Sequence, residues 1–222
     1  MSDNSVAVLG TVWGEKYRAH LPEWFAAIDA LEVKPDQIIV ATLPDEVSFL
    51  DGFPCEVAVC EHPNIELMVN AAATKAKTTW LSPCGVDDRY RPEAFNDLPN
   101  IGDDVGVVSV GVITTNGERI DARPGQNMLD GNPHGVLGTS FIRRSLWEQI
   151  GGYDDRFMIS DWALWIKAAM AGAKFWMSPR HTHVIDISSP GRISSNGFSG
   201  EAYKQLDDLR SGRVPSTDLE VR

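Results

Sequence analysis

The chain has 222 residues, enough for one sizeable hydrophobic core, so we expect a single domain. Apolar residues make up 43% of it and charged residues 23%, a mixture that excludes disorder over most of its length. With 20 Lys and Arg against 31 Asp and Glu, the net charge of −11 repels nucleic acid, so we expect no nucleic-acid partner. A phosphorylated ligand would also be repelled unless its site held a metal ion or converging cationic groups.

The sequence carries no signal for a membrane or a secretory route. No run of about 18 apolar residues could span a membrane, and the N-terminus lacks the features of a signal peptide. We therefore expect a cytoplasmic protein without a membrane span. Three cysteines, Cys55, Cys60 and Cys84, form an odd set without a C-x-x-C spacing, which favours reduced structural thiols over disulfides or a zinc site.

The first half of the chain alternates predicted strands and helices. Four apolar runs are typical of buried strands, and two stretches carry apolar residues at helical spacing. The strands are expected at 6–9, 38–42, 56–60 and 78–82, and the helices at 17–31 and 65–76. This alternation predicts an α/β fold with a mostly parallel sheet, helices on both faces, and ligand sites at the carboxyl ends of the strands.

The second half is expected to be mixed rather than doubly wound. Strands are predicted at 105–113, 136–142, 174–178 and 182–187, and a short helix at 145–150. Ser160 is predicted to cap a further helix, which Gly172 ends. The polar, Gly- and Ser-rich segment 191–222 is interpreted as a C-terminal lid or tail, with one short helix near 200–210.

Several common catalytic motifs are missing. The sequence has no P-loop, no dinucleotide fingerprint after the first strand, no G-x-S-x-G and no H-E-x-x-H. His181 and His183 are two residues apart, which on a regular strand would place both on one face. They fit either a metal pair or two histidines on a solvated strand edge.

Two groups of carboxylates stand out. Asp87 and Asp88 directly follow a predicted strand, where paired carboxylates suit a hard divalent cation or, equally, a solvated turn. Asp161 lies in the first turn of a predicted helix beside Trp162. A partly sheltered carboxylate there can act as a general base, or it can be an ordinary acid at a helix start.

These segments resemble the family 2 glycosyltransferases, which adopt the GT-A fold. Residues 70–76, 79–81 and 86–92 are similar, without a gap, to that family's asparagine helix, fourth strand and Asp-x-Asp-Asp…Pro loop. Farther on, the segments 138–144, 150–154 and 160–172 are similar to its arginine pair, Gly-Gly-Phe-Asp turn and Glu-Asp helix. The likeness covers roughly residues 5–195.

The resemblance implies a GT-A domain over 1–190, with a nucleotide-binding half at 1–92 and an acceptor and catalytic half at 93–190. It implies inverting transfer of a sugar from a UDP- or TDP-sugar to a hydroxyl of a soluble glycan, protein or small molecule. Mn²⁺ or Mg²⁺ would be the cofactor, because a cation on Asp87 neutralises the leaving diphosphate. Asp161 matches the family's base, and an oligomer is compatible with all of this.

The other expected site residues are set against three departures from the family's pattern. After the second strand, where the family has nucleotide-binding acids, this chain has the segment 41–45, in which Asp45 is expected to substitute. Gly85 stands where the family has its first metal-site acid, so Asp88 and His183 are expected to complete the metal set. Ser160 stands where the family has the Glu of its Glu-Asp pair. The expected nucleotide contacts are Thr11, Trp13, Asp45 and Lys75, and the expected substrate contacts are Gly138, Thr139 and Trp162.

Alternatives remain for several of these assignments. Trp13 also fits a core position, and Lys75 also fits a solvated helix surface. The departures at Gly85 and Ser160 equally suit a non-catalytic relative that binds carbohydrate or protein, since fold alone does not carry function. A nucleotidyltransferase is a further alternative, although no Gly-rich phosphate loop follows the first strand.

Overall fold

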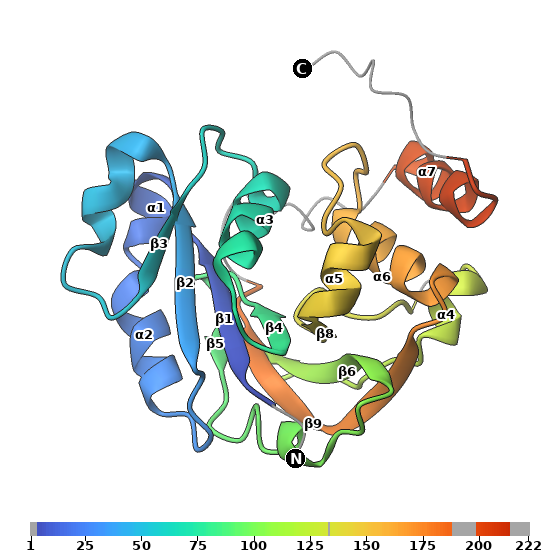
Figure 1. Ribbon diagram of the computed structural model, residues 1–222, viewed down its shortest axis with the longest axis horizontal. Coiled ribbons are helices and arrows are strands. Elements are labelled where there is room, and N and C mark those ends of the chain that lie inside the picture. Colours follow the sequence, from blue (N-terminus) through green and yellow to red (C-terminus); the bar gives the residue numbers. More distant parts are fainter. Residues whose placement is uncertain (1–3, 133, 188–198, 214–222) are drawn as a thin grey trace.

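The structure, a computed structural model, describes residues 4–132, 134–187 and 199–213. Within these ranges, helices flank one nine-stranded mixed sheet (Figure 1). Its strands are β1 Val6–Thr11, β2 Gln37–Thr42, β3 Glu56–Val59, β4 Trp80–Pro83, β5 Arg89–Tyr90, β6 Val105–Thr114, β7 Arg119–Ile120, β8 Phe141–Arg143 and β9 Lys174–Ile185. The helices are α1 Gly14–Arg18, α2 Leu21–Asp29, α3 Ile65–Lys75, α4 Gln126–Leu129, α5 Arg144–Ile150, α6 Ser160–Met170 and α7 Gly200–Arg210, with 3₁₀ turns η1 Pro44–Leu50 and η2 Leu98–Asn100.

The directions of the strands define one edge of the sheet where loops gather. The order is β3-β2-β1-β4-β8-β6-β9-β5, with β7 paired to β6. Strands β3, β2, β1 and β4 are parallel, whereas β8 is antiparallel to both β4 and β6. Strand β6 therefore runs in the same direction as β4, and β9 is parallel to β6. The carboxyl ends of β1, β2, β4, β6 and β9 thus share one edge, as predicted for the parallel half.

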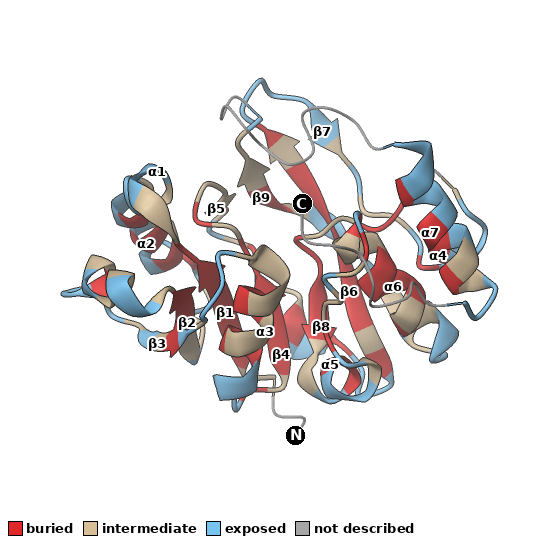
Figure 2. Cartoon of the chain, turned by 90° about the horizontal axis from the view of Figure 1, so that it is seen from above, coloured by how far each residue is buried: buried red, intermediate tan, exposed pale blue. Residues whose placement is uncertain are grey.

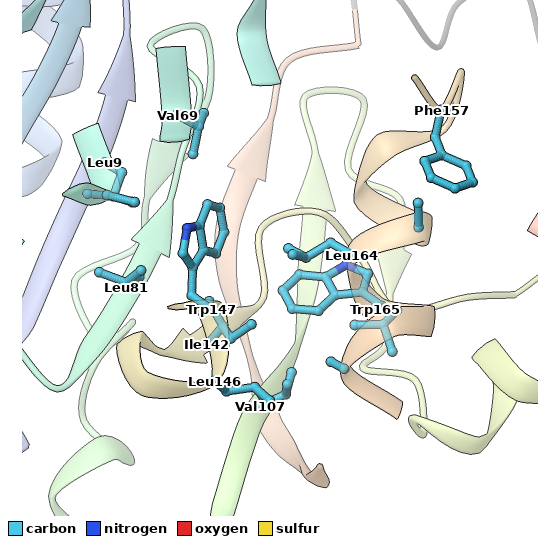
Figure 3. Packing of buried hydrophobic residues seen from close by; sticks show 14 of the residues in the cluster. Leu9, Val69, Leu81, Val107, Ile142, Leu146, Trp147, Phe157, Leu164 and Trp165 are labelled. Carbon is cyan, nitrogen blue, oxygen red and sulfur yellow. The ribbon is translucent and has the colours of Figure 1, made fainter. Parts of the chain in front are cut away.

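Alternate residues of the strands contribute their side chains to two hydrophobic clusters, one on each face of the sheet. Ala7 and Leu9 of β1 face the cluster under α3, α5, α6 and α7, and Val6 and Val8 face the cluster under α2. Figure 3 shows Trp147 of α5 packed in the first cluster with strand residues such as Leu81. The buried residues lie along the strands and the inner sides of the helices (Figure 2), so the prediction of helices on both faces is confirmed.

Several predicted elements have different boundaries in the structure, and the strand expected at 136–142 is only the short β8, Phe141–Arg143. The helix expected over 17–31 is divided into α1 and α2, and Pro22 stands in the first turn of α2, where its missing N–H leaves no hydrogen bond unmade. The strands expected at 174–178 and 182–187 are one strand, β9, whose pairing with β6 is irregular near Gly111. Pro179, which has no backbone N–H to donate to a neighbouring strand, lies between the two segments that were expected to be separate strands.

The C-terminal helix and the start of α6 are also informative. Helix α7 spans the predicted residues and buries Ala202, Leu206 and Leu209 in the first cluster. The rest of the predicted lid or tail, 191–198 and 214–222, lies outside the described residues. Ser160 does not cap α6 as predicted: Ile159 holds the cap position, and the Ser160 hydroxyl is bonded elsewhere. Among the described helices, none is long and apolar enough to cross a membrane.

Candidate functional site

The topology brings several of the candidate residues to the carboxyl edge of the sheet. Asp87 and Asp88 follow β4, and α3 begins at this edge after β3. Helix α6 ends where β9 begins, and the first residues of β9 and β6, Lys174 and Val105, are paired at the opposite edge. The start of α6 therefore lies at the carboxyl edge. The segment before β8 lies there too, since β8 runs in the opposite direction.

The loop after β4 directs two carboxylates at the same point. The Cys84 N–H donates to the Leu9 carbonyl at 3.0 Å, which fixes the start of the loop on β1. A Cβ atom at Gly85 would stand 2.7 Å from Oδ1 of Asp87 and 3.9 Å from Oδ2 of Asp88. The Asp87 carboxylate therefore occupies the space that a side chain at position 85 would need, so a larger residue there would require that carboxylate to move.

Neighbouring elements hold this loop from both sides. Oδ1 of Asp88 accepts a hydrogen bond from the Asp186 N–H at 3.0 Å, just beyond β9. The Arg89 guanidinium donates to the Val86 carbonyl at 2.7 Å and to Glu23 of α2 at 2.8 Å. On α1, burial and then the negative charge of Asp87 raise the pKa of the Tyr17 phenol. The loop is thus fixed against α1, α2 and the end of β9.

The oxygen donors of this loop fit a hard divalent cation in kind. Asp87 and Asp88 supply carboxylates, the ligands that Mn²⁺ and Mg²⁺ prefer, although one Asp88 oxygen already accepts a hydrogen bond. Among the described residues, no group of three or more His, Cys, Asp or Glu side chains is arranged to hold a metal ion. A cation here would therefore have two protein carboxylates and would need further oxygens from its ligand or from water.

The structure does not bring His183 into that set. His181 pairs with Gly111 and His183 with Val112, so the irregularity in β9 places the two histidines on opposite faces of the sheet. The His183 side chain is 0% exposed and packs on the Tyr90 ring at 4.5 Å, with Nδ1 hydrogen-bonded to Thr182 Oγ1 at 2.8 Å. Burial lowers its pKa to about 3, so His183 is a neutral core residue.

Asp161 has the surroundings of a base that titrates near neutrality. Its Oδ1 accepts a hydrogen bond from the Trp162 N–H at 2.9 Å, and its Oδ2 lies against Gly138, where a Cβ would stand 3.0 Å away. Burial raises the pKa of Asp161 to about 6, and the negative charge of Glu66 adds to this shift. A carboxylate with that pKa is ionised at pH 7 and accepts a proton readily.

Helix α3 supports the segment that leads to Asp161, a relationship that sequence reasoning missed. The Asn70 side chain donates to the Tyr153 carbonyl at 2.9 Å and accepts from the Tyr153 N–H at 3.0 Å. One turn earlier, Glu66 accepts a hydrogen bond from the Ser160 hydroxyl at 2.6 Å. Glu66 and Asn70 are four residues apart and share a helix face, a spacing that could have indicated a joint role.

The expected nucleotide contacts near the end of β1 have different surroundings in the structure. Thr11 ends β1 and is buried, and Trp13 precedes α1 with its ring 4.5 Å from that of Tyr17. Asp45 is exposed in the first turn of η1 and does not hold this loop. Instead, both carboxylate oxygens of Glu46 accept from the Gly14 N–H at 3.0 Å, a contact that the sequence did not reveal.

Lys75 lies at the opposite edge of the sheet. It is exposed in the last turn of α3, two residues before Lys77, whose N–H donates to the Gln37 side chain at the start of β2. The structure therefore does not bring Lys75 to the carboxyl edge. The pair Arg143 and Arg144 also lies at this amino edge, where Arg144 donates to the Thr78 carbonyl at 2.9 Å.

The expected substrate contacts cluster around Asp161. Gly138 touches its carboxylate, and the next residue, Thr139, is buried with its hydroxyl oxygen unpaired among the described residues. The Trp162 ring packs over Gly135 and lies 6.3 Å from the ring of Tyr203 on α7. The loop before β8, the start of α6 and α7 thus surround one point of the carboxyl edge.

Comparison with known structures identifies the fold as GT-A. TarS (residues 1–349) from S. aureus, solved in complex with UDP-GlcNAc, superposes with a TM-score of 0.72 at 14% sequence identity over 97% of this chain and 68% of that chain. The same protein in complex with UDP gives a TM-score of 0.70 at 13% identity, over 97% and 67%. Mannosyltransferase PcManGT from Pyrobaculum calidifontis, in complex with GDP-Man and Mn²⁺, gives 0.59 at 17% identity over 84% and 57%.

The comparisons confirm the predicted fold class. The neighbours are glycosyltransferases, and the mixed α/β domain of this chain matches their GT-A fold. No protein-family model matches the sequence, and no curated protein sequence matches it. At these identities the likeness establishes the fold, and the activity must be argued from the site.

Proposed function

We propose that this protein is a metal-dependent, inverting glycosyltransferase that moves a sugar from a UDP- or TDP-sugar to an acceptor hydroxyl. The neighbours in complex with UDP-GlcNAc, UDP and GDP-Man support a nucleotide-sugar donor. The observation that carries the proposal is the pair of acidic sites at one sheet edge. Asp87 and Asp88 lie over Gly85, and Asp161, with a pKa of about 6, lies against Gly138.

On the donor side, residues 1–92 would bind the nucleotide. Thr11 and Trp13 at the end of β1 are proposed to contact the nucleoside, together with Asp45 of η1. Glu46 of η1 holds the neighbouring Gly14 N–H. Mn²⁺ or Mg²⁺ would be held by Asp87 and Asp88, and when bound it would supply positive charge to the leaving diphosphate. A cation there would offset the repulsion between the diphosphate and a protein of net charge −11.

On the acceptor side, residues 93–190 would bind the acceptor, with Gly138, Thr139 and Trp162 around Asp161. In the proposed reaction the acceptor oxygen attacks the anomeric carbon from the face opposite the diphosphate, and the bond to the diphosphate breaks. Asp161 takes the proton of the attacking hydroxyl. A single displacement of this kind inverts the configuration. The acceptor is proposed to be a soluble glycan, protein or small molecule, met in the cytoplasm.

The experiment is transfer or hydrolysis of UDP- and TDP-sugars by the purified chain, with Mn²⁺, with Mg²⁺ and with chelator. We expect release of nucleoside diphosphate that depends on the metal and disappears in Asp161→Asn. A thermal-shift panel of nucleotide sugars, each with and without Mn²⁺, would select the donor first, because a ligand that binds the folded state raises the melting temperature. Unchanged turnover in Asp161→Asn would remove the assignment of the base.

One observation favours a second candidate, a non-catalytic module that binds carbohydrate or protein. The described residues offer two carboxylates rather than a group of three for a metal. Calorimetry separates the two: if UDP, TDP and GDP with Mn²⁺ all fail to bind at millimolar concentration, the binding module is the better account. Release of pyrophosphate instead of nucleoside diphosphate would indicate a nucleotidyltransferase.

A further inference from the structure

A second carboxylate lies beside the proposed base. Glu66 accepts the Ser160 hydroxyl at 2.6 Å, and Ser160 immediately precedes Asp161 at the start of α6. Glu66 and Ser160 are 94 residues apart in the sequence. We propose that Glu66, delivered by α3, is a positioning residue for Asp161 and takes the place of the acid that is missing at position 160. This inference rests on the proposed function, in which Asp161 is the base.

Helix α3 holds Glu66 in a defined place. Its cap residue, Asn64, accepts a hydrogen bond from the Leu67 N–H at 2.9 Å, which fixes the turn that contains Glu66. Asn70, one turn farther along, makes two hydrogen bonds to the backbone of Tyr153. Two side chains of one helix therefore hold both ends of the segment 153–160, so α3 determines where the first turn of α6 lies.

Glu66 is also the charged neighbour of Asp161. From α6 itself, Asp161 receives a hydrogen bond from the Trp162 N–H, and the loop before β8 presents Gly138, which carries no charge. From the turn before α6, the Tyr153 phenol is kept neutral because burial, Asp161 and Glu66 all raise its pKa. Among the described groups, Glu66 on α3 is the charge that acts on Asp161.

The consequence for the chemistry follows from repulsion between like charges. An anion fixed near Asp161 makes its carboxylate hold a proton more tightly, which strengthens it as a base. The Ser160 hydroxyl fixes that anion by donating to it. A glutamate at position 160 would instead place a second negative charge next to Glu66, and the two carboxylates would repel each other. Ser160, whose hydroxyl donates a hydrogen bond to Glu66, avoids this repulsion.

The test measures the titration of Asp161 directly and separately from turnover. Carboxyl carbons of ¹³C-labelled protein are followed by NMR from pH 4 to 9, and Asp161 is assigned by its loss in Asp161→Asn. We expect Glu66→Gln to lower the pKa of Asp161 by roughly half a unit or more and to move the acidic limb of the rate profile to lower pH by the same amount. Glu61→Gln, at an exposed acid just before α3, is the matched control and should shift neither.

Further variants, which change Ser160, keep the inference testable if Glu66→Gln does not fold. Ser160→Ala keeps Glu66 but releases its carboxylate, and should lower the pKa of Asp161 while nucleotide binding stays within twofold. The exchange Glu66→Ser with Ser160→Glu should recover more turnover than Ser160→Glu alone. An Asp161 pKa that is unchanged in both Glu66→Gln and Ser160→Ala would overturn the inference. Because the NMR titration needs no turnover, a shifted pKa in a chain without transferase activity would count against the proposed function alone.

Discussion

Gly138 lies directly against the carboxylate of Asp161. A Cβ atom at position 138 would stand 3.0 Å from Oδ2 of Asp161 and 3.5 Å from its Cβ. Gly138 is not among the glycines with positive φ, so its backbone conformation does not require glycine. A side chain at position 138 would instead press on the Asp161 carboxylate.

Gly138→Ala is therefore expected to impair turnover through the position of Asp161. The added methyl group would lie closer to the Asp161 carboxylate than ordinary van der Waals contact allows, so the carboxylate must move by a few tenths of an ångström. We expect kcat to fall about tenfold or more with nucleotide binding unchanged, because small misplacements of catalytic groups are costly. Gly200→Ala is the matched control, since a Cβ there meets nothing within 4 Å. Equal kcat in both variants would contradict the prediction.

Asp161→Asn should separate activity from stability. The pKa of Asp161 is about 6 in the folded chain, against the ordinary value of 3.8, so the folded state binds this proton more tightly than the unfolded state. Ionised Asp161 therefore lowers the free energy of unfolding above pH 6, and this penalty vanishes below about pH 3.8, where both states are protonated.

The expected result is a variant that melts at a higher temperature than the parent at pH 8 but not at pH 4. Its kcat should fall roughly 10²- to 10⁴-fold, while UDP-sugar affinity stays within twofold. Melting temperatures across this pH range, together with single-turnover kinetics, provide the measurement. A stability difference that does not depend on pH would show that Asp161 is not the perturbed group.

The sequence could predict the elements that repeat a simple pattern. The parallel half and α3 follow from buried apolar runs and helical spacing, and the places of Asp87 after a strand and Asp161 at a helix start follow from these elements. The roles expected of the two aspartates came from the family resemblance. Contacts between distant segments left no local signal. Glu66 with Ser160, and Glu46 with Gly14, depend on how α3 and η1 pack, and the positions of His181 and His183 depend on an irregular pairing of β9 with β6.

Asp87→Asn is expected to weaken nucleotide binding only when a divalent cation is present. The side chain loses one of the two carboxylates that lie over Gly85, so a cation held there binds less tightly. We expect the Kd for UDP with Mn²⁺ to rise about tenfold or more, which corresponds to about 1.4 kcal/mol, and the Kd in chelator to stay unchanged. Asp155→Asn, at an exposed acid before α6, is the control for loss of negative charge. The measurement is calorimetry of UDP binding with and without Mn²⁺. An equal rise in Kd in chelator would refute the metal role.

Asn70→Ala should destabilise the fold, whereas Lys75→Ala on the same helix should not. Asn70 makes two partly buried hydrogen bonds to Tyr153, and their loss leaves backbone groups unpaired. We expect a loss of about 1–3 kcal/mol in the free energy of unfolding. Lys75 is exposed at the amino edge, so its variant should match the parent in both stability and nucleotide affinity. Urea titrations and UDP binding give the two readouts, and weakened UDP binding in Lys75→Ala would contradict its placement away from the site.

His183 should make the fold sensitive to acid. Burial lowers its pKa to about 3 in the folded chain from the ordinary value of 6.5, so below pH 6.5 the unfolded state binds a proton that the folded state does not. Stability is then lost as the pH falls from 6.5 towards 3, at up to about 1.4 kcal/mol for each pH unit. His183→Phe should flatten this slope, because phenylalanine does not titrate. Any cost of repacking against Tyr90 and Phe141 lowers stability equally at every pH and does not affect the slope.

The measurement is the free energy of unfolding by urea at several pH values between 7 and 4, with His62→Gln, at an exposed histidine, as the control. The two variants should differ clearly in slope; identical slopes would mean that the pKa of His183 is not lowered in the folded chain.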